Sequence, residues 1–435
     1  MPHVLDTRSD DFERRFSALL ALKRETDADV SATVAEIIAD VRARGDAALI
    51  DYTARFDRLT LTPDRLAVTA GEIDAAIAGI DAETRAALEL AAERIRDFHA
   101  RQVPADAAWT DAAGATVGWR WRAVGAAGLY VPGGLAAYPS SVLMNALPAD
   151  VARVSERVIC VPTPDDVLNP LVLLAARLSG IETVYRVGGA QAVAAMAYGT
   201  ETISAVDVIV GPGNAYVAAA KRQVFGSVGI DMIAGPSEVL IITDGEADPD
   251  WLALDLLAQA EHDTSAQSIL LTTDAAFGRK VGEAVEHRLT TLTRAEIAGE
   301  SWRTNGAIIA VRDLAEAAEL ADRIAPEHLE LAVAEPKALA DRIRNAGAMF
   351  LGAWTPEAIG DYVAGPNHVL PTARSARFSS GLSVLNFMKR TTMAQLPPAA
   401  LGAIGPAAEA LAAAEGLEAH GLSVRARLDR LNEGA

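Results

Sequence analysis

The sequence predicts an α/β protein with two alternating strand–helix units and helical segments at both ends. Short β-branched runs alternate with helical patterns of about 10–15 residues, which is typical of βαβ units and a parallel sheet. The alternation forms two blocks with a seam near residues 233–236. The chain has 435 residues, enough for two or three domains of roughly 100–200 residues each.

The first hundred residues carry helical periodicity. Residues 10–58 have this pattern, with a helix predicted over 30–57. An Ala-rich pattern over 72–103 predicts another helix. We expect residues 1–29 to form a helical extension and assign residues 30–235 to the first α/β domain.

The first alternating block follows an uncharged run over residues 123–149. Glycines and prolines interrupt this run too often for a membrane-spanning helix, which needs about 20 continuous apolar residues. We therefore interpret the run as buried loops and turns around a site. The interruptions are Gly128, Pro132, Gly133, Gly134, Pro139 and Pro148. Strands are predicted in 154–164, 181–189 and 205–214, and helices in 168–180 and 190–200.

The second block, assigned to a domain over residues 236–381, repeats the alternation. Its predicted strands lie in 237–244, 267–274, 305–313, 328–335 and 345–352. Its predicted helices lie in 251–263, 313–324 and 336–345. The remaining residues, 382–435, are predicted to form a helical tail, broken at Gly416, that docks on a partner subunit.

Composition and charge exclude several classes of partner. The formal charge of −19 repels nucleic acid and anionic membranes, so neither is expected as a partner. The single cysteine, Cys160, allows no disulfide within the chain, and the charged N-terminus lacks the apolar stretch of a signal peptide. These features predict a cytoplasmic enzyme with a small-molecule substrate.

Gln259 and His262 indicate a metal site. They are three residues apart on a predicted helix and therefore share one face. An imidazole and an amide oxygen there could bind one divalent ion, although a merely solvated helix end is also consistent. Asp361 and His368 in a Gly- and Pro-rich loop, and His420 between the terminal helices, extend this set. Such nitrogen and oxygen donors suit Zn²⁺ or Mn²⁺.

His328 is the candidate general base. It follows Pro326 and Glu327, and because proline favours the first helical position we expect His328 in the first turn of a helix. The positive end of the helix dipole would lower its pKa and keep the imidazole neutral, as a base requires. A capping or packing histidine is the alternative. The remaining histidines, His3, His99 and His287, are predicted to be exposed to solvent.

The evidence for a cofactor lies in glycine turns after predicted strands. The chain contains neither GxGxxG nor GxxxxGK[ST], so it lacks the standard dinucleotide fingerprint and the P-loop. Turns at 188–189 and 211–213 each lead into a helix whose N-terminus could meet a phosphate. Tyr130 lies on a third such loop. Cys160, in VICVP, has the pattern of a buried strand, so we interpret it as a core residue.

Six longer segments together resemble the histidinol dehydrogenase family. They are GGAQAVAAMAYGT, VIVGPGNAYVAAAKRQVFGSVGIDMIAGPSEVL, DLLAQAEHD, RIAPEHLEL, DYVAGPNHVLPT and ARFSSGLSVLNFMKRTT. The resemblance implies oxidation of L-histidinol to L-histidine through L-histidinaldehyde, the last steps of histidine biosynthesis, with two NAD⁺ and one Zn²⁺ per site. It also implies two Rossmann-like domains, akin to aldehyde dehydrogenases, in an intertwined homodimer.

The resemblance also implies roles for individual residues. The zinc ligands would be Gln259, His262, Asp361 and His420, and the acid–base pair would be Glu327 and His328. Besides the zinc ligands and His328, the substrate contacts would be Ser237, His368 and Glu415. The NAD contacts would be Tyr130, Gln191 and Asn214. In this family the terminal segment that carries His420 reaches the neighbouring subunit's site.

The two residues after HVLPT depart from the family pattern. Family members commonly have a glycine pair after HVLPT, where this chain has Ala373 and Arg374, so we assign that loop no substrate role.

Three other functions compete with the one that the resemblance implies. A metal-dependent hydrolase could use the same His, Asp and Gln set to activate water. The other two alternatives are a thiol-dependent aldehyde dehydrogenase acting through Cys160 and a non-catalytic metal-binding scaffold.

Overall fold

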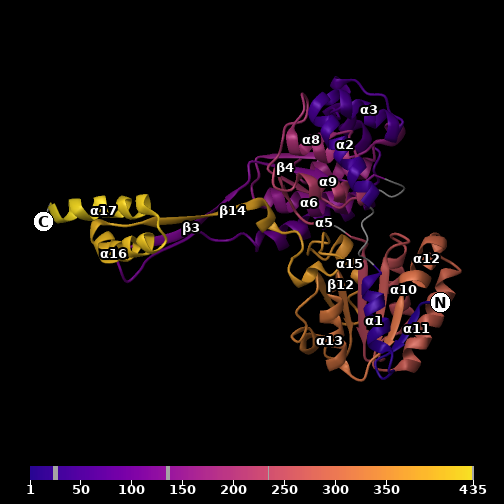
Figure 1. The fold of residues 1–435 in the computed structure, drawn as a ribbon. Helices are drawn as coiled ribbons and strands as arrows, with labels where there is room; N and C mark the ends of the chain where they lie inside the picture. The colour runs from indigo at the N-terminus through magenta and orange to yellow at the C-terminus, as the bar shows by residue number, and fades with distance from the viewer. Residues whose placement is uncertain (23–27, 134–137, 234, 434–435) are drawn as a thin grey trace. The chain divides into compact units, whose positions relative to one another are not determined.

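The computed structural model describes residues 1–22, 28–133, 138–233 and 235–433, which form two compact units (Figure 1). The first unit comprises residues 1–102 and 125–387, and the second comprises 103–124 and 388–435. The predicted domain ranges did not anticipate that residues 103–124 leave the first α/β block. They do so because strand β3 (Thr116–Ala123) pairs along its whole length with β14 (Met388–Gln395).

The helices before the first sheet are shorter than predicted. The helix expected over 30–57 is two helices, α2 (Ala28–Arg44) and α3 (Asp46–Asp57). Gly45 separates them with a φ of +55°, a left-handed conformation that glycine adopts without the clash of a Cβ. The pattern over 72–103 likewise divides into α4 (Ala70–Ile77) and α5 (Ala82–Ala100).

The first sheet has five parallel strands in the order β6-β5-β4-β7-β8. Its strands are β4 (Ala126–Tyr130), β5 (Glu156–Cys160), β6 (Thr183–Tyr185), β7 (Val208–Val210) and β8 (Gly229–Ile230). Its helices are α6 (Pro139–Val151), α7 (Pro170–Leu178), α8 (Gly189–Tyr198) and α9 (Ala215–Val224). The chain builds outward from β4 to β6 and then returns to the other side of β4, so the strand order reverses between β4 and β7.

The uncharged run over 123–149 was predicted as loops and turns, and that prediction was wrong for most of it. The run contains β4 and the larger part of α6, in which Pro139 occupies a first-turn position that tolerates a missing N–H. Pro148 lies inside the helix. The predicted turn residue Gly134 lies outside the described residues. Among the helices that the structure describes, none combines the length and apolar character that crossing a membrane requires.

The second sheet has six parallel strands in the order β1-β11-β10-β9-β12-β13. Its strands are β1 (His3–Asp6), β9 (Glu238–Thr243), β10 (Gln267–Thr272), β11 (Ala307–Ala310), β12 (His328–Ala332) and β13 (Ala348–Leu351). Its helices are α1 (Phe12–Ala21), α10 (Pro249–Ala260), α11 (Ala275–Leu289), α12 (Ala295–Asn305), α13 (Leu314–Ile324), α14 (Pro336–Ala340) and α15 (Glu357–Tyr362). The predicted parallel sheets are confirmed, and the chain passes from the first sheet to the second between β8 and β9. Residues 1–29 are not wholly helical, because β1 adds an edge strand beside β11.

The second unit consists of a three-stranded antiparallel sheet and two helices. The sheet, in the order β14-β3-β2, includes β2 (Ala107–Thr110). The helices α16 (Pro398–Ala414) and α17 (Glu418–Glu433) pack against each other, and Gly416 separates them with a φ of +71°. The predicted break at Gly416 is confirmed, but the tail begins with a strand and is not helical throughout.

Candidate active site

His328 begins strand β12 and is the centre of a buried polar cluster. It was predicted in the first turn of a helix, but Pro326 and Glu327 precede a strand, so that prediction was wrong. The His328 side chain is 6% exposed, and burial lowers the pKa of its imidazole to about 4. The neutral state that the sequence predicted therefore arises from loss of hydration and not from a helix dipole.

The hydrogen bonds of His328 define its tautomer. Nδ1 lies 3.0 Å from the Glu238 carbonyl oxygen, which only accepts, so Nδ1 carries the proton. Nε2 is therefore the basic nitrogen, and it has no hydrogen-bond partner within the described part of the chain. A buried, neutral imidazole with a free lone pair can accept a proton from a bound alcohol.

Glu327 is held by the same residue that orients His328. Its Oε2 accepts from the Glu238 backbone N–H at 2.8 Å and lies 3.8 Å from His328 Nδ1. The backbone of Glu238 thus contacts both side chains, one through its N–H and the other through its carbonyl. Because Glu238 is the first residue of the central strand β9, which pairs with β12, the sheet itself sets the spacing of the Glu–His pair.

Asp361 lies between two further imidazoles. Its Oδ1 is 3.3 Å from Nδ1 of His368, and its Oδ2 is 3.9 Å from Nε2 of His262. Burial raises the pKa of Asp361, but the hydrogen bond from His368 and the neighbouring imidazoles outweigh burial and hold that pKa below its ordinary value. An ionised carboxylate between imidazoles is a suitable ligand arrangement for a divalent ion.

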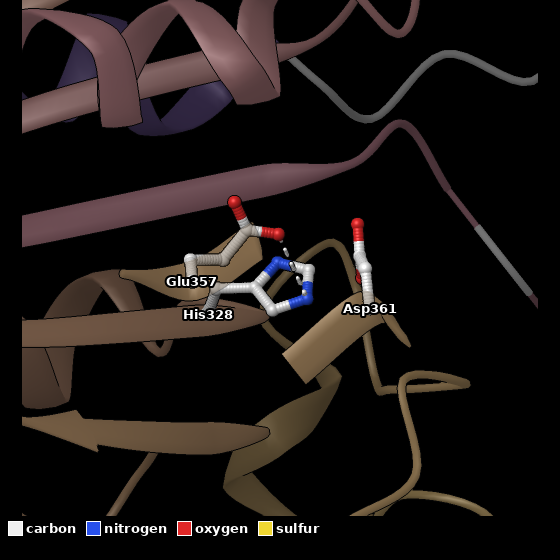
Figure 2. Close-up of side chains that lie close together, drawn as sticks. All are labelled: His328, Glu357 and Asp361. Carbon is white, nitrogen blue, oxygen red and sulfur yellow. Dashed lines mark ion pairs between the residues drawn. The ribbon is translucent and has the colours of Figure 1, made fainter. Parts of the chain in front are cut away.

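Glu357 joins His328 and Asp361 in a compact group of three possible ligands (Figure 2). The donor atoms of the three residues lie within 4.8 Å of one another, and Glu357 Oε1 is 3.7 Å from His328 Nε2. Burial and the nearby carboxylate of Asp361 hold the pKa of Glu357 well above its ordinary value. Glu357 is not among the residues predicted from the sequence. Its position four residues before Asp361, on the same face of α15, was the available signal.

Gln259 and His262 lie at and just beyond the end of α10. The helix ends at Ala260, so His262 lies in the following turn and not on the helix as predicted. The Gln259 side chain is 1% exposed, and its Oε1 has no hydrogen-bond partner among the described residues. A buried amide oxygen without a donor is costly unless a ligand satisfies it. α10, which ends beside Gln259, packs against α15, which carries Asp361, and an amide oxygen, an imidazole and a carboxylate are donor types that suit a divalent ion.

The predicted cofactor residues surround the place where the first sheet reverses its strand order. Tyr130 ends β4, and its buried hydroxyl accepts from the Gly189 N–H at 3.1 Å, at the start of α8. Gln191 lies in the first turn of α8 and is 2% exposed. Asn214 follows β7 and caps α9, where its Oδ1 accepts from two backbone N–H groups. Dinucleotides bind at the carboxyl ends of strands at such a reversal.

Two predicted residues, Glu415 and His420, belong to the second unit. Glu415 follows the last residue of α16 and His420 lies in α17, and both are exposed residues of the second unit. Ser237 immediately precedes β9, and its carbonyl accepts from the Gln267 N–H at 3.0 Å.

The remaining predictions concern single side chains. Cys160 is fully buried, and burial raises its pKa to about 12, so its interpretation as a core residue is confirmed. His3 and His287 are exposed as predicted. His99 was predicted to be exposed, but it is fully buried because the inner face of α5 packs on α6.

Two parallel α/β sheets, with a Glu–His pair and a set of possible metal ligands at strand and helix ends, define this protein as an α/β enzyme. A family model of histidinol dehydrogenase matches residues 21–428. The chain belongs to the histidinol dehydrogenase family, whose members are NAD-dependent oxidoreductases of histidine biosynthesis.

Individual relatives agree with this assignment. Histidinol dehydrogenase of Cereibacter sphaeroides is 72% identical over 434 residues, covering 100% of both chains. That of Ruegeria pomeroyi is 69% identical over 432 residues, covering 99% of this chain and 100% of the relative. The crystal structure of histidinol dehydrogenase from Elizabethkingia anophelis has 38% identity and a TM-score of 0.95, with 99% of each chain covered.

Proposed function

We propose that the buried cluster around His328 is the site where this chain oxidises L-histidinol to L-histidine, through L-histidinaldehyde, with reduction of two NAD⁺. The observation that carries the proposal is the neutral His328, whose free Nε2 lies beside Glu357 and near Asp361. A metal-dependent hydrolase would need a base but no dinucleotide site, whereas the position of the proposed NAD contacts Tyr130, Gln191 and Asn214 near the strand reversal of the first sheet supports a dehydrogenase.

Gln259, His262, Asp361 and His420 are proposed to hold one Zn²⁺. The unpartnered Gln259 Oε1 and the 3.9 Å separation between His262 and Asp361 support the first three. When bound, the ion would supply positive charge that fixes the imidazole and amino nitrogens of histidinol. Because His420 belongs to the other structural unit, we propose that the fourth ligand is His420 of the partner subunit in a homodimer.

His328 is proposed to serve both oxidations. In the first, Nε2 accepts the hydroxyl proton while a hydride passes from the carbinol carbon to NAD⁺, leaving the aldehyde. In the second, the Glu327 carboxylate takes a proton from water as the oxygen attacks the aldehyde carbon, and the proton on His328 Nε2 passes to the carbonyl oxygen, which completes the hydrate and returns His328 to its neutral form. His328 then accepts a hydroxyl proton of the hydrate as a second hydride passes to the second NAD⁺. Nδ1, bonded to the Glu238 carbonyl, keeps the ring in one orientation through both steps.

Substrate orientation is proposed to involve Ser237 and His368 of one chain with Glu415 of the partner subunit. The 3.3 Å contact of His368 with Asp361 supports its place beside the metal ligands. We further propose that the enzyme works in the cytoplasm, where its buried Cys160 would stay reduced.

The stoichiometry of NADH formation tests this function. We expect two NADH per histidinol consumed, and no NADH after a chelator has removed the metal. A His328→Asn variant should lower turnover by about 10²–10⁴-fold while it retains zinc. His287→Asn, which alters an exposed histidine on α11, should leave turnover unchanged. One NADH per histidinol, activity that survives chelation, or unchanged turnover in His328→Asn would refute the corresponding part of the proposal.

A further inference from the structure

Asn367 anchors the loop that carries His368. This asparagine, next to His368 in sequence, is 7% exposed. Its Nδ2 donates to the Met144 carbonyl of α6 at 2.6 Å and lies 3.3 Å from Nε2 of His99 on α5. Its Oδ1 accepts from the Val369 N–H at 2.9 Å. One amide side chain therefore shapes the turn around His368 and ties that turn to two helices of the first α/β half.

His99 presents an acceptor to this amide because its tautomer is fixed. Its Nδ1 lies 2.7 Å from Oε1 of Gln102, an oxygen that also accepts from the Val384 N–H at 3.5 Å. An amide oxygen only accepts, so Nδ1 carries the proton and Nε2 offers its lone pair to Asn367. The ring is fully buried, and burial lowers the pKa of His99, which favours this neutral form. The chemistry proposed above uses neither His99 nor Asn367.

A second contact holds the same loop on α5. Arg94 donates from Nε to the Val363 carbonyl at 2.5 Å and from Nη2 to the Ala364 carbonyl at 3.3 Å. Gly365, with a φ of +106°, passes so close that a Cβ there would lie 3.1 Å from the Arg94 carbonyl oxygen. The segment between Asp361 and His368 is thus held on α5 at Val363, Ala364 and Gly365.

We propose that Asn367 and His99 are positioning residues, which hold His368 against Asp361 and thereby set the geometry of the substrate site. This inference rests on the proposed function. The carboxylate of Asp361 comes from α15, whereas His368 comes from the loop after it, so their 3.3 Å contact depends on how that loop is held. The Asn367 side chain reaches both α5 and α6.

The two ends of the Asn367 amide have separable tasks. Oδ1 closes a local turn, whereas Nδ2 makes both long-range contacts. An aspartate at this position keeps an acceptor for Val369 but loses the donors to Met144 and His99. If anchoring positions His368, Asn367→Asp should be as defective as Asn367→Ala. If only the turn matters, Asn367→Asp should restore wild-type behaviour.

The test compares steady-state kinetics of the zinc-loaded wild type, Asn367→Ala, Asn367→Asp and Asn169→Ala. Asn169 is a matched control, because its Oδ1 accepts from the N–H two residues on at 2.9 Å, as that of Asn367 does, but at the start of α7. We expect both Asn367 variants to raise KM for histidinol at least about tenfold, since a displacement of about 1 Å can cost roughly 10²-fold. KM for NAD⁺ should stay within about twofold, and Asn169→Ala should change neither constant.

Each outcome decides a different point. If the wild type does not oxidise histidinol, the proposed function fails and this inference falls with it. If the wild type is active and folded Asn367 variants keep its KM for histidinol, the positioning role alone is refuted. A parallel rise of both KM values also refutes it, because general damage would then explain the effect. If Asn367→Ala does not fold, the His99→Gln variant tests the positioning role in its place. An unchanged KM for histidinol in His99→Gln would refute a positioning role for the contact between Asn367 and α5.

Discussion

At the scale of single residues, burial determines the chemistry of His328. A histidine in water has a pKa of about 6.5, and the sequence offered a helix dipole as the reason for a neutral ring. His328 instead begins a central strand, where the charged form of its ring loses hydration and the Nδ1–H donates to a backbone carbonyl. Nearby Asp361 favours the charged form, but burial dominates. The base is therefore neutral for a different reason than the sequence suggested.

This explanation predicts how stability depends on pH. The pKa of His328 is about 6.5 in the unfolded chain and about 4 in the folded one, so the unfolded state binds a proton first as pH falls. The stability associated with the neutral ring is fully present above pH 6.5 and is lost progressively towards pH 4, by roughly 3 kcal/mol. Urea denaturation of chelator-treated protein should show this loss of unfolding free energy between pH 6.5 and pH 4 in the wild type. The loss should be absent from His328→Gln. A free-energy difference between the two proteins that does not change with pH would contradict the explanation.

At the scale of elements, the loop after β13 and α15 contains an unusual backbone. Ala373 and Arg374 have φ values of +51° and +65°. In this left-handed region a Cβ costs about 1–2 kcal/mol. The loop is nevertheless held at two points. The Ala373 N–H donates to Glu238 Oε1 at 3.1 Å, and the Gly235 N–H donates to Thr372 Oγ1 at 2.5 Å.

Ala373→Gly should therefore stabilise the protein. Removing the Cβ relieves the strain of the left-handed conformation in the folded state. The greater conformational freedom of glycine in the unfolded chain offsets part of this stabilisation, so the free energy of unfolding should rise by up to about 1 kcal/mol. Ala334→Gly is the matched control. Ala334 is also exposed and its N–H also donates to a carboxylate, Asp244 at 2.7 Å, but it lies outside the left-handed region. Glycine there should destabilise. Equal effects of the two substitutions, measured by urea denaturation, would show that φ is not the cause.

At the scale of the whole molecule, the division into two units has a functional consequence. The first unit contains the Glu–His pair, three of the four predicted zinc ligands and the proposed cofactor site. The second unit carries Glu415 and His420 on exposed helical surface, beside exposed apolar side chains such as Leu417 and Leu422. A surface of this kind is suited to contact with a second copy of the chain.

Subunit mixing tests whether sites are shared in a dimer. Neither a His420→Asn homodimer nor a Glu327→Gln homodimer should be fully active. A heterodimer of the two would contain one site with both residues intact if His420 comes from the partner subunit, so activity should recover on mixing. If each site takes both residues from one chain, every site in the heterodimer has a defect. Verified heterodimers without recovered activity would therefore exclude the shared site.

The sequence by itself determined the features that depend on local pattern. Alternating β-branched runs and helical periods predicted both parallel sheets, because these periodicities follow from backbone geometry. The run of motifs identified the family, which the matches over nearly the whole chain confirm. The burial of Cys160 was also predictable, because its neighbours in VICVP are all apolar or strand-forming.

Only the tertiary structure decided the features that depend on contacts between distant segments. Pairing of β1 with β11 turned part of a predicted helical extension into an edge strand, and pairing of β3 with β14 moved residues 103–124 into another unit. Burial of His99 against the loop of Asn367, and the approach of Glu357 to His328, likewise join residues far apart in the chain. Local periodicity contains no information about such pairs, because burial and pKa depend on what a distant segment places beside each side chain.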